Sequence, residues 1–166
     1  MGSILTIPVH GDSTRGRFAV AAAKARPGNE PPPHVHEWED EVIYLLEGRV
    51  EFCCGRRHFV ANAGNTVFIP QGVPHAMTFR TPAVRLLAVI SATDERPVAL
   101  DRYFRAMSAP TTSLALPAPG TAETYATAAD PAHAARLAAE HGARFLSPDE
   151  TRELLPGYPG LGAQRR

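Results

Sequence analysis

Residues Gly28–Glu41 read GNEPPPHVHEWEDE, a stretch that places two histidines between a proline run and a group of acidic side chains. His34 and His36 are separated by one residue, and side chains at this spacing on an extended strand point to the same face. Both imidazoles can therefore bind one metal ion. Glu41 lies an odd number of residues after both histidines, so it joins them only if residues 37–40 form a turn that resets the phase of the strand.

A second stretch, Gly64–His75, reads GNTVFIPQGVPH and carries a third histidine. Gly64 and Gly72 mark turns, and His75 opens a new strand directly after a proline, where the missing N–H is tolerated. His75 can thus face the interior from a different strand. Three imidazoles and one carboxylate suit one divalent transition metal (iron, nickel, manganese, cobalt, copper or zinc), with positions left open for water, oxygen or substrate.

The order and spacing of these residues resemble the two sequence motifs of the cupin superfamily. The first motif is a Gly, five residues, His-x-His, three or four residues, Glu, six residues and Gly. The second is a Gly, five residues, Pro-x-Gly, two residues and His. One position departs from the pattern, because Phe79 stands where the second motif usually has an Asn that does not bind the metal. The residues that match are Gly28, His34, His36, Glu41, Gly48, Gly64, Pro70, Gly72 and His75, and the resemblance implies that His34, His36, Glu41 and His75 are the metal ligands.

A narrower resemblance is to quercetinase-like cupins, single-domain flavonol dioxygenases whose barrel is followed by an aromatic helix similar to Leu100–Arg105. The superfamily resemblance covers about residues 17–90, and the narrower one extends to about residue 107. In such enzymes the metal-binding Glu also accepts the proton of the flavonol 3-hydroxyl, a role that Glu41 would take here. The resemblance therefore predicts an enzyme of secondary metabolism. This enzyme would be a metal-dependent dioxygenase that uses O2 on an aromatic or enolisable hydroxy-ketone, either flavonol-like or polyketide-derived.

Two other functions fit the same residues. The first is an oxygen-independent isomerase, cyclase or decarboxylase, in which the ion polarises a carbonyl as a Lewis acid. The second is a non-catalytic cupin that binds a small molecule. All three readings share the metal ligands, so the ligand set alone does not choose among them.

Three residues are candidate substrate contacts. If His75 faces the interior, alternation along its strand puts Met77 and Phe79 on the same face, where they form an apolar wall near the metal or plain barrel core. Trp38, the single tryptophan, either caps the pocket or packs on a partner subunit. The acidic side chains beside it are interpreted as a solvated loop: Glu37, Glu39 and Asp40.

Sixteen prolines and thirteen glycines divide much of the chain into short segments, which predicts an all-β sandwich or barrel. With the cupin resemblance, the expected fold is a double-stranded β-helix, or jelly-roll barrel. We expect the barrel with a closing helix in residues 1–107, a linker over 108–127 and a short helical C-terminal extension over 128–166. The expected strands are Arg17–Ala25, His34–His36, Val42–Leu46, Val50–Cys54, Arg57–Ala61, Thr66–Ile69, His75–Phe79 and Val84–Ile90, and the expected helices are Leu100–Met107, Asp130–Glu140 and Ser147–Leu155.

Composition excludes several classes of protein. The 166 residues are 44% hydrophobic, enough for one domain with a sizeable core. Seventeen Lys and Arg balance seventeen Asp and Glu, so no basic surface favours nucleic acid or an anionic membrane. Cys53 and Cys54 are neighbours, whose side chains on a strand point to opposite faces, so we expect no disulfide between them. We expect a soluble, cytoplasmic protein that binds no membrane, and the resemblance implies a homodimer.

Overall fold

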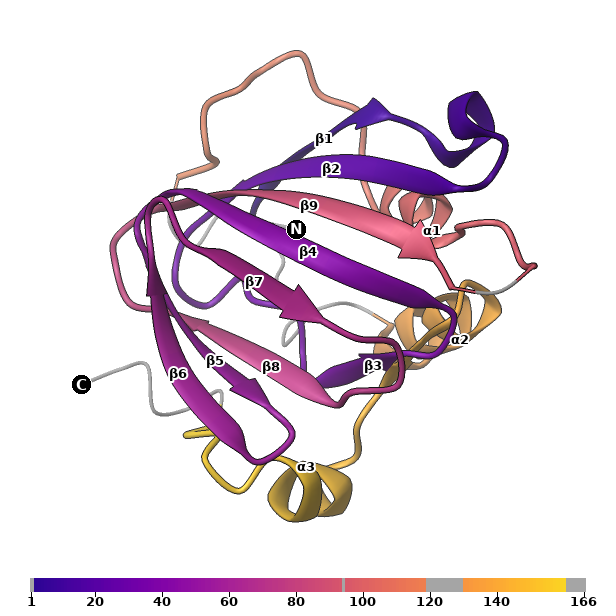
Figure 1. Cartoon of the computed structure of the whole chain (residues 1–166). Helices are drawn as coiled ribbons and strands as arrows, with labels where there is room; N and C mark the ends of the chain where they lie inside the picture. The colour runs from indigo at the N-terminus through magenta and orange to yellow at the C-terminus, as the bar shows by residue number, and fades with distance from the viewer. Residues whose placement is uncertain (1, 94, 119–129, 161–166) are drawn as a thin grey trace.

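The computed structural model describes residues 2–93, 95–118 and 130–160 and shows a barrel with helices on its outside (Figure 1). The strands are β1 (Ile4–Val9), β2 (Phe18–Ala25), β3 (His34–His36), β4 (Glu39–Glu47), β5 (Arg49–Cys54), β6 (Arg57–Asn62), β7 (Thr66–Ile69), β8 (His75–Phe79), β9 (Val84–Ala92) and β10 (Ala143–Phe145). The helices are the 3₁₀-helix η1 (Gly11–Thr14) and the α-helices α1 (Leu100–Ala106), α2 (Pro131–Glu140) and α3 (Pro148–Leu154).

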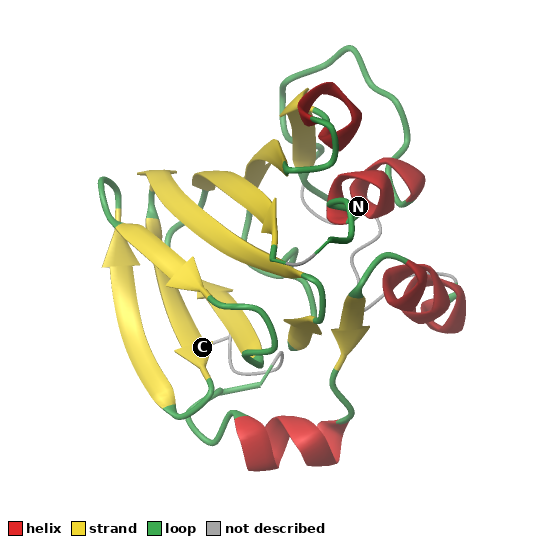
Figure 2. Ribbon diagram, turned by 45° about the vertical axis from the view of Figure 1, so that its right-hand side comes forward, coloured by secondary structure: helices red, strands yellow, loops and turns green. Residues whose placement is uncertain are grey.

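The strands form two antiparallel sheets that face each other across the interior (Figures 1 and 2). The strand order is β1-β2-β9-β4-β7 in one sheet and β10-β3-β8-β5-β6 in the other. Strands far apart in sequence are neighbours, as β2 is to β9 and β3 is to β8. This is the topology of a double-stranded β-helix, so the predicted all-β jelly-roll is confirmed. It places β3 and β8 side by side, with β4 in the other sheet.

The core lies between the two sheets, toward which strands such as β4 turn alternate apolar side chains. On β4, Ile43 and Leu45 are 1% and 0% exposed, whereas Tyr44 between them is 40% exposed. Phe52 on β5 is fully buried and packs in the same cluster. Burying a side chain of this size contributes roughly 1.5–3 kcal/mol to stability. The apolar core therefore stabilises the strands that also carry polar groups in the interior.

All eight strands expected from the sequence are present, and two further strands are not among those expected. β1 pairs with β2 at one sheet edge, and β10 pairs with β3 at an edge of the other sheet. The C-terminal extension is therefore not only helical, because it also supplies a strand to the barrel. Three residues are too few to show an alternating pattern, which explains why the sequence did not reveal β10.

A glycine allows β10 to approach the barrel closely. Gly142 directly precedes β10 and has a φ of +76°, a conformation that side chains with a Cβ rarely adopt. A Cβ at this position would lie 2.4 Å from Cδ2 of Trp38. The ring of Trp38 thus lies against the Gly142 backbone, whose carbonyl oxygen accepts a hydrogen bond from the N–H of Glu37.

The expected helices are present, with bounds within two residues of those expected, and their caps explain where two of them begin. The side chain of Asp130 accepts a hydrogen bond from the N–H of His133 at the start of α2. Ser147 and Glu150 form a capping box at the start of α3. Among the residues that the structure describes, no helix has the length and apolar character needed to cross a membrane.

Both cysteines are free, as expected from their adjacent positions on β5. Cys53 packs with Val35 and Leu146 in one cluster, while Cys54 packs against the core cluster between the sheets. Burial raises the pKa of the Cys54 thiol to about 11, so this side chain is a neutral thiol at neutral pH.

The homodimer stays a prediction. The sheet that contains β4 and β7 exposes apolar side chains on its outer face, with Leu46 45% and Phe68 58% exposed. A second copy that packs on this face would cover them.

Candidate metal centre

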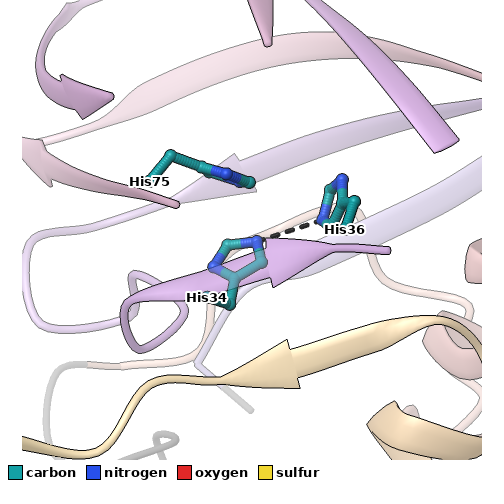
Figure 3. A group of neighbouring side chains, drawn as sticks. All are labelled: His34, His36 and His75. Atoms are coloured by element: carbon teal, nitrogen blue, oxygen red, sulfur yellow. Dashed lines mark hydrogen bonds between the residues drawn. The ribbon is translucent and has the colours of Figure 1, made fainter. Parts of the chain in front are cut away.

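The three motif histidines meet inside the barrel (Figure 3). His34 and His36 project from β3, and His75 projects from β8, where it pairs directly with His34 across the two antiparallel strands. All three side chains are buried, and one ring nitrogen from each lies within 4.8 Å of the others. The prediction that His75 joins the other two from a different strand is confirmed.

Backbone carbonyls fix the orientation of two of the rings. Nδ1 of His34 lies 2.8 Å from the carbonyl oxygen of Pro32, and Nδ1 of His75 lies 2.9 Å from that of Val73. A carbonyl can only accept, so each Nδ1 carries the proton and each Nε2 keeps its lone pair. Such hydrogen bonds are typical of metal-binding histidines, because they set the tautomer and hold the ring in place.

The nitrogens that these hydrogen bonds leave unused fit a metal ion. The Nε2 atoms of His34 and His36 are 3.1 Å apart and share a hydrogen bond, in which one ring donates and the other accepts (Figure 3). Two nitrogens bound at right angles, each about 2.1 Å from one ion, would be about 3.0 Å apart. Nε2 of His75 is buried and has no hydrogen-bond partner in the described part of the chain. A buried polar atom without a partner is costly, and a metal ion would satisfy it.

The electrostatics of the site favour neutral imidazoles, the form that binds metals. Burial lowers the pKa of His34, and the neighbouring His75 and His36 lower it further. Burial and His75 likewise lower the pKa of His36. Burial lowers the pKa of His75 to about 4, against the opposing effect of its hydrogen bond to Val73. All three rings therefore offer lone pairs at neutral pH.

Glu41 faces the same interior from β4 in the opposite sheet. A four-residue turn over residues 37–40 was expected here, but β3 ends at His36 and β4 begins at Glu39, so only two residues lie between the two strands. Oε2 of Glu41 lies 3.9 Å from Nδ1 of His36 and 4.0 Å from Nε2 of His75. The tight group of metal-ligating atoms contains the three histidines without Glu41, so its role as the fourth ligand stays a prediction.

The pKa of the Glu41 carboxyl lies near neutral pH. Burial raises the pKa of its carboxyl to about 7, and the nearby Glu39 adds to the shift. A metal ion at the histidines would favour the ionised form of Glu41 through its positive charge. A carboxylate with these properties can bind a cation and exchange a proton near neutral pH.

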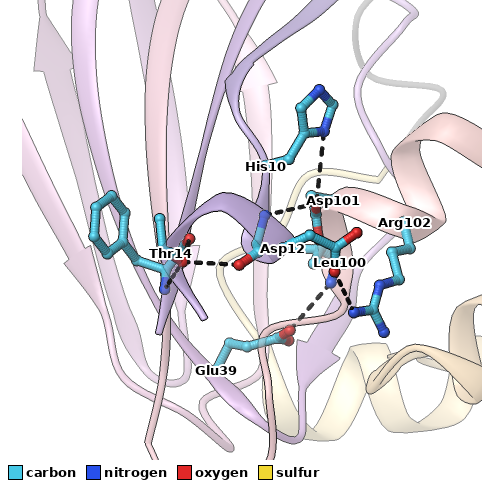
Figure 4. Close-up of polar contacts among 9 residues, drawn as sticks. His10, Asp12, Thr14, Glu39, Leu100, Asp101 and Arg102 are labelled. Carbon is cyan, nitrogen blue, oxygen red and sulfur yellow. Dashed lines mark hydrogen bonds and ion pairs between the residues drawn. The ribbon is translucent and has the colours of Figure 1, made fainter. Parts of the chain in front are cut away.

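The interpretation of the acidic run as a solvated loop was wrong for Glu39 and Asp40, because both lie on β4. The side chain of Glu39 is fully buried, and Oε1 accepts hydrogen bonds from the N–H groups of Ala99 at 2.7 Å and Leu100 at 3.1 Å (Figure 4). Glu39 thereby ties the start of α1 to β4, two residues before Glu41. Glu37 is exposed, as a solvated loop predicts.

A cavity of about 530 Å³ opens onto the metal centre, and this volume is typical of sites for small molecules. His34, His36 and Glu41 line it. His75 is fully buried and is not part of the lining. Met77 and Phe79 line the same cavity, on the face that alternation along β8 predicts. Their role as substrate contacts stays a prediction.

Trp38 is not part of the cavity lining. Its ring packs against Gly142, and the guanidinium carbon of Arg96 lies 5.2 Å from the ring centre. This position does not favour Trp38 as a cap on the pocket.

The lining also includes residues that the sequence did not single out. Tyr103 and Phe104 on α1 contribute, as does the stretch that follows this helix. The aromatic helix in the narrower resemblance was a signal for the first two. The composition of the following stretch indicated only a linker.

Acidification should destabilise the metal-free protein more steeply than exposed groups alone would predict. A histidine whose pKa is lowered by folding is neutral in both states above its unfolded pKa near 6.5, so it does not affect stability there. Below that pH the unfolded state takes up a proton that the folded state does not, and the free energy of unfolding falls until the pH reaches the folded pKa, about 4 for His75. The cost is about 1.4 kcal/mol per pH unit for each such histidine. We expect the free energy of unfolding, measured in urea with chelator present, to fall between pH 6.5 and 4, because three histidines outweigh the opposite effect of Glu39 and Glu41, two carboxyls whose pKa burial raises.

His75→Asn should flatten this dependence, since it removes one of the three buried titrating rings. His133→Ala is the control, because His133 is exposed on α2. Equal slopes for the wild type and His75→Asn would contradict the prediction.

Comparison with known proteins agrees with this fold. Residues 23–90 match the sequence profile of the cupin domain. The chain is 27% identical over 85 residues to quercetin 2,3-dioxygenase from Bacillus subtilis, across 51% of this chain and 25% of the relative. It is 31% identical over 75 residues to an uncharacterized protein from Methanocaldococcus jannaschii, across 45% of this chain and 60% of that protein. The matches thus span less than two thirds of either curated relative.

Among solved structures, the cupin domain of Schizosaccharomyces pombe Cnp3 aligns with a TM-score of 0.50 at 16% identity, covering 55% of this chain and 62% of that one. A likeness at this level of identity concerns the fold.

Proposed function

We propose that the chain is a metal-dependent dioxygenase, because residues 23–90 match the cupin domain and the barrel gathers three buried histidines. Its substrate would be an aromatic or enolisable hydroxy-ketone, either flavonol-like or polyketide-derived. The observation that carries the proposal is the position of Glu41, a buried carboxyl that faces the histidines and lines an apolar cavity. The similarity to a quercetin 2,3-dioxygenase supports the choice of substrate class.

The histidines would hold the ion through the nitrogens that their backbone contacts leave free. His34 and His75 would bind through Nε2, since Nδ1 of each donates to a carbonyl oxygen. A divalent transition metal in this position would supply Lewis-acid polarisation and access to oxygen chemistry. Iron, nickel, manganese, cobalt, copper and zinc all suit this donor set.

Glu41 would accept the proton from the substrate hydroxyl at Oε2. A general base works best when its pKa lies near the operating pH, and burial brings the pKa of Glu41 to about 7. Met77 and Phe79 would hold the apolar part of the substrate and keep water from the ionised oxygen.

The two alternatives use the same site. An oxygen-independent isomerase, cyclase or decarboxylase would need the cation and Glu41 but no O2. A non-catalytic cupin would bind the ligand in the same cavity and leave it unchanged. The requirement for oxygen and the fate of the ligand separate the three.

Oxygen uptake by metal-loaded protein tests the proposal. The protein is loaded in turn with each candidate metal and mixed with 3-hydroxyflavone in an oxygen electrode. We expect uptake that requires both metal and flavonol, and no product under strict anaerobiosis. Equal conversion without oxygen would favour the Lewis-acid enzyme. Binding without conversion under any of these conditions would favour the non-catalytic cupin.

A further inference from the structure

One wall of the cavity comes from a segment outside the barrel strands. Residues 108–117, here called the strap, follow α1, and most of them line the cavity together with His34 and His36. The strap arches over β1 at one side of the molecule, whereas β3 and β8 lie toward the other side (Figure 1). The cavity therefore extends from the metal centre to the strap.

The strap is fastened to the barrel at its far end. Nη1 of Arg26, which follows β2, donates a hydrogen bond of 2.6 Å to the carbonyl oxygen of Pro117. At its near end, the N–H of Met107 donates to the carbonyl oxygen of Tyr103 and continues the last turn of α1. With both ends held, the strap has a defined inner side.

Two leucines show which side faces the cavity. Leu116 is half-buried and lines the cavity. Leu114 is 72% exposed and is not part of the lining. Leu116 thus faces the cavity, whereas Leu114, two positions earlier, faces solvent.

The lining is poor in charge. Among the described residues that line the cavity, Glu41 is the only Asp, Glu, Lys or Arg. The other polar groups are neutral at pH 7, such as the hydroxyls of Thr111 and Ser113 on the strap. The lining itself therefore offers no counter-charge to an anionic group far from the metal, and the guanidinium of Arg26 contacts the strap without lining the cavity.

We propose that the strap is a second recognition element, which binds the uncharged, apolar end of an elongated substrate whose hydroxy-ketone lies at the histidines. Leu116 is the specificity-determining residue in this element. The identity of the group at the metal rests on the proposed function, but recognition by the strap does not depend on oxygen chemistry.

Two probes that share the metal-binding hydroxy-ketone distinguish binding by the strap from binding at the metal centre. 3-Hydroxyflavone carries a fused ring and a phenyl group beyond its hydroxy-ketone, whereas maltol has the hydroxy-ketone and only a methyl group. Binding of each to nickel-loaded protein is measured by calorimetry without oxygen. Leu116→Ala should weaken 3-hydroxyflavone about fivefold or more, given the apolar contact that is lost, and leave maltol within about twofold.

Leu114→Ala is the matched control and should change neither affinity. Arg26→Gln, which removes the hydrogen bond to Pro117, should act in the same direction as Leu116→Ala.

Failure of the strap proposal and failure of the proposed function are distinguishable. Equal effects of Leu116→Ala on both probes, no effect on either, or no binding of 3-hydroxyflavone to the wild type would overturn recognition by the strap. Selective weakening of 3-hydroxyflavone, combined with the absence of oxygen uptake, would retain the strap and reject the dioxygenase.

Discussion

Replacing His75 with alanine is expected to reduce the metal content of the purified protein at least tenfold. The ring of His75 is fully buried, and its unpaired Nε2 completes a group whose other nitrogens come from the neighbouring strand β3. Loss of one of three imidazoles leaves too few donors to compete with water and buffer for the ion. Metal per chain, measured by mass spectrometry after dialysis against a defined metal mixture, gives the result directly.

The control is His133→Ala, which removes an imidazole from the exposed face of α2 and should leave metal content unchanged. Because alanine at position 75 leaves a void, near-native circular dichroism and a cooperative unfolding transition are needed to show that the barrel persists. A second variant, His36→Ala, should give the same loss. Wild-type metal content in both folded variants would contradict the assignment of the site.

The parts of the site that follow from local patterns were predictable from the sequence. Residues two positions apart on a strand share a face, so His34 and His36 had to converge if β3 was extended. The spacing of the second motif placed His75 at the start of β8. Alternation from His75 then placed Met77 and Phe79 in the cavity lining, where the structure has them.

The parts that depend on long-range contacts were not predictable. Glu39 lies in a run of acidic residues that resembles a solvated turn, yet Oε1 of its carboxylate accepts hydrogen bonds from backbone N–H groups 60 and 61 residues later. β10 is three residues long and gains its strand pairing only through β3. The strap has the composition of a linker. Its position at the cavity is set by the point where α1 ends and by the hydrogen bond from Arg26 to Pro117.

These long-range contacts act on the same strand as the proposed base. β4 carries Glu39 and Glu41 on one face, so the residue that anchors α1 also lies beside the carboxyl that faces the metal centre. α1 in turn contributes Tyr103 and Phe104 to the cavity and leads into the strap. The candidate metal centre, the proposed proton acceptor and the distal wall of the cavity are therefore held by one connected set of elements, as a well-ordered site requires.

Replacing Glu41 with glutamine should lower kcat for the flavonol by about 10²- to 10⁴-fold, the usual contribution of a positioned general base. Glutamine has nearly the same shape but cannot accept the hydroxyl proton at neutral pH. The buried carboxyl has a pKa of about 7 in the metal-free protein, and a bound cation would lower it, so the wild type should lose activity on the acid side as Glu41 becomes protonated. That acid limb should be absent from the residual activity of Glu41→Gln.

Loss of the base must be separated from loss of the metal, since Glu41 is also a predicted ligand. Turnover is therefore compared at equal measured metal content, reached with excess metal where necessary, and anaerobic binding of 3-hydroxyflavone is measured alongside. Glu37→Gln, on the exposed turn between β3 and β4, is the matched control and should keep wild-type kcat. Full turnover by metal-loaded Glu41→Gln would remove the proposed proton acceptor while leaving the three-histidine centre intact, and the reaction would then need its base from elsewhere in the cavity or from the substrate itself.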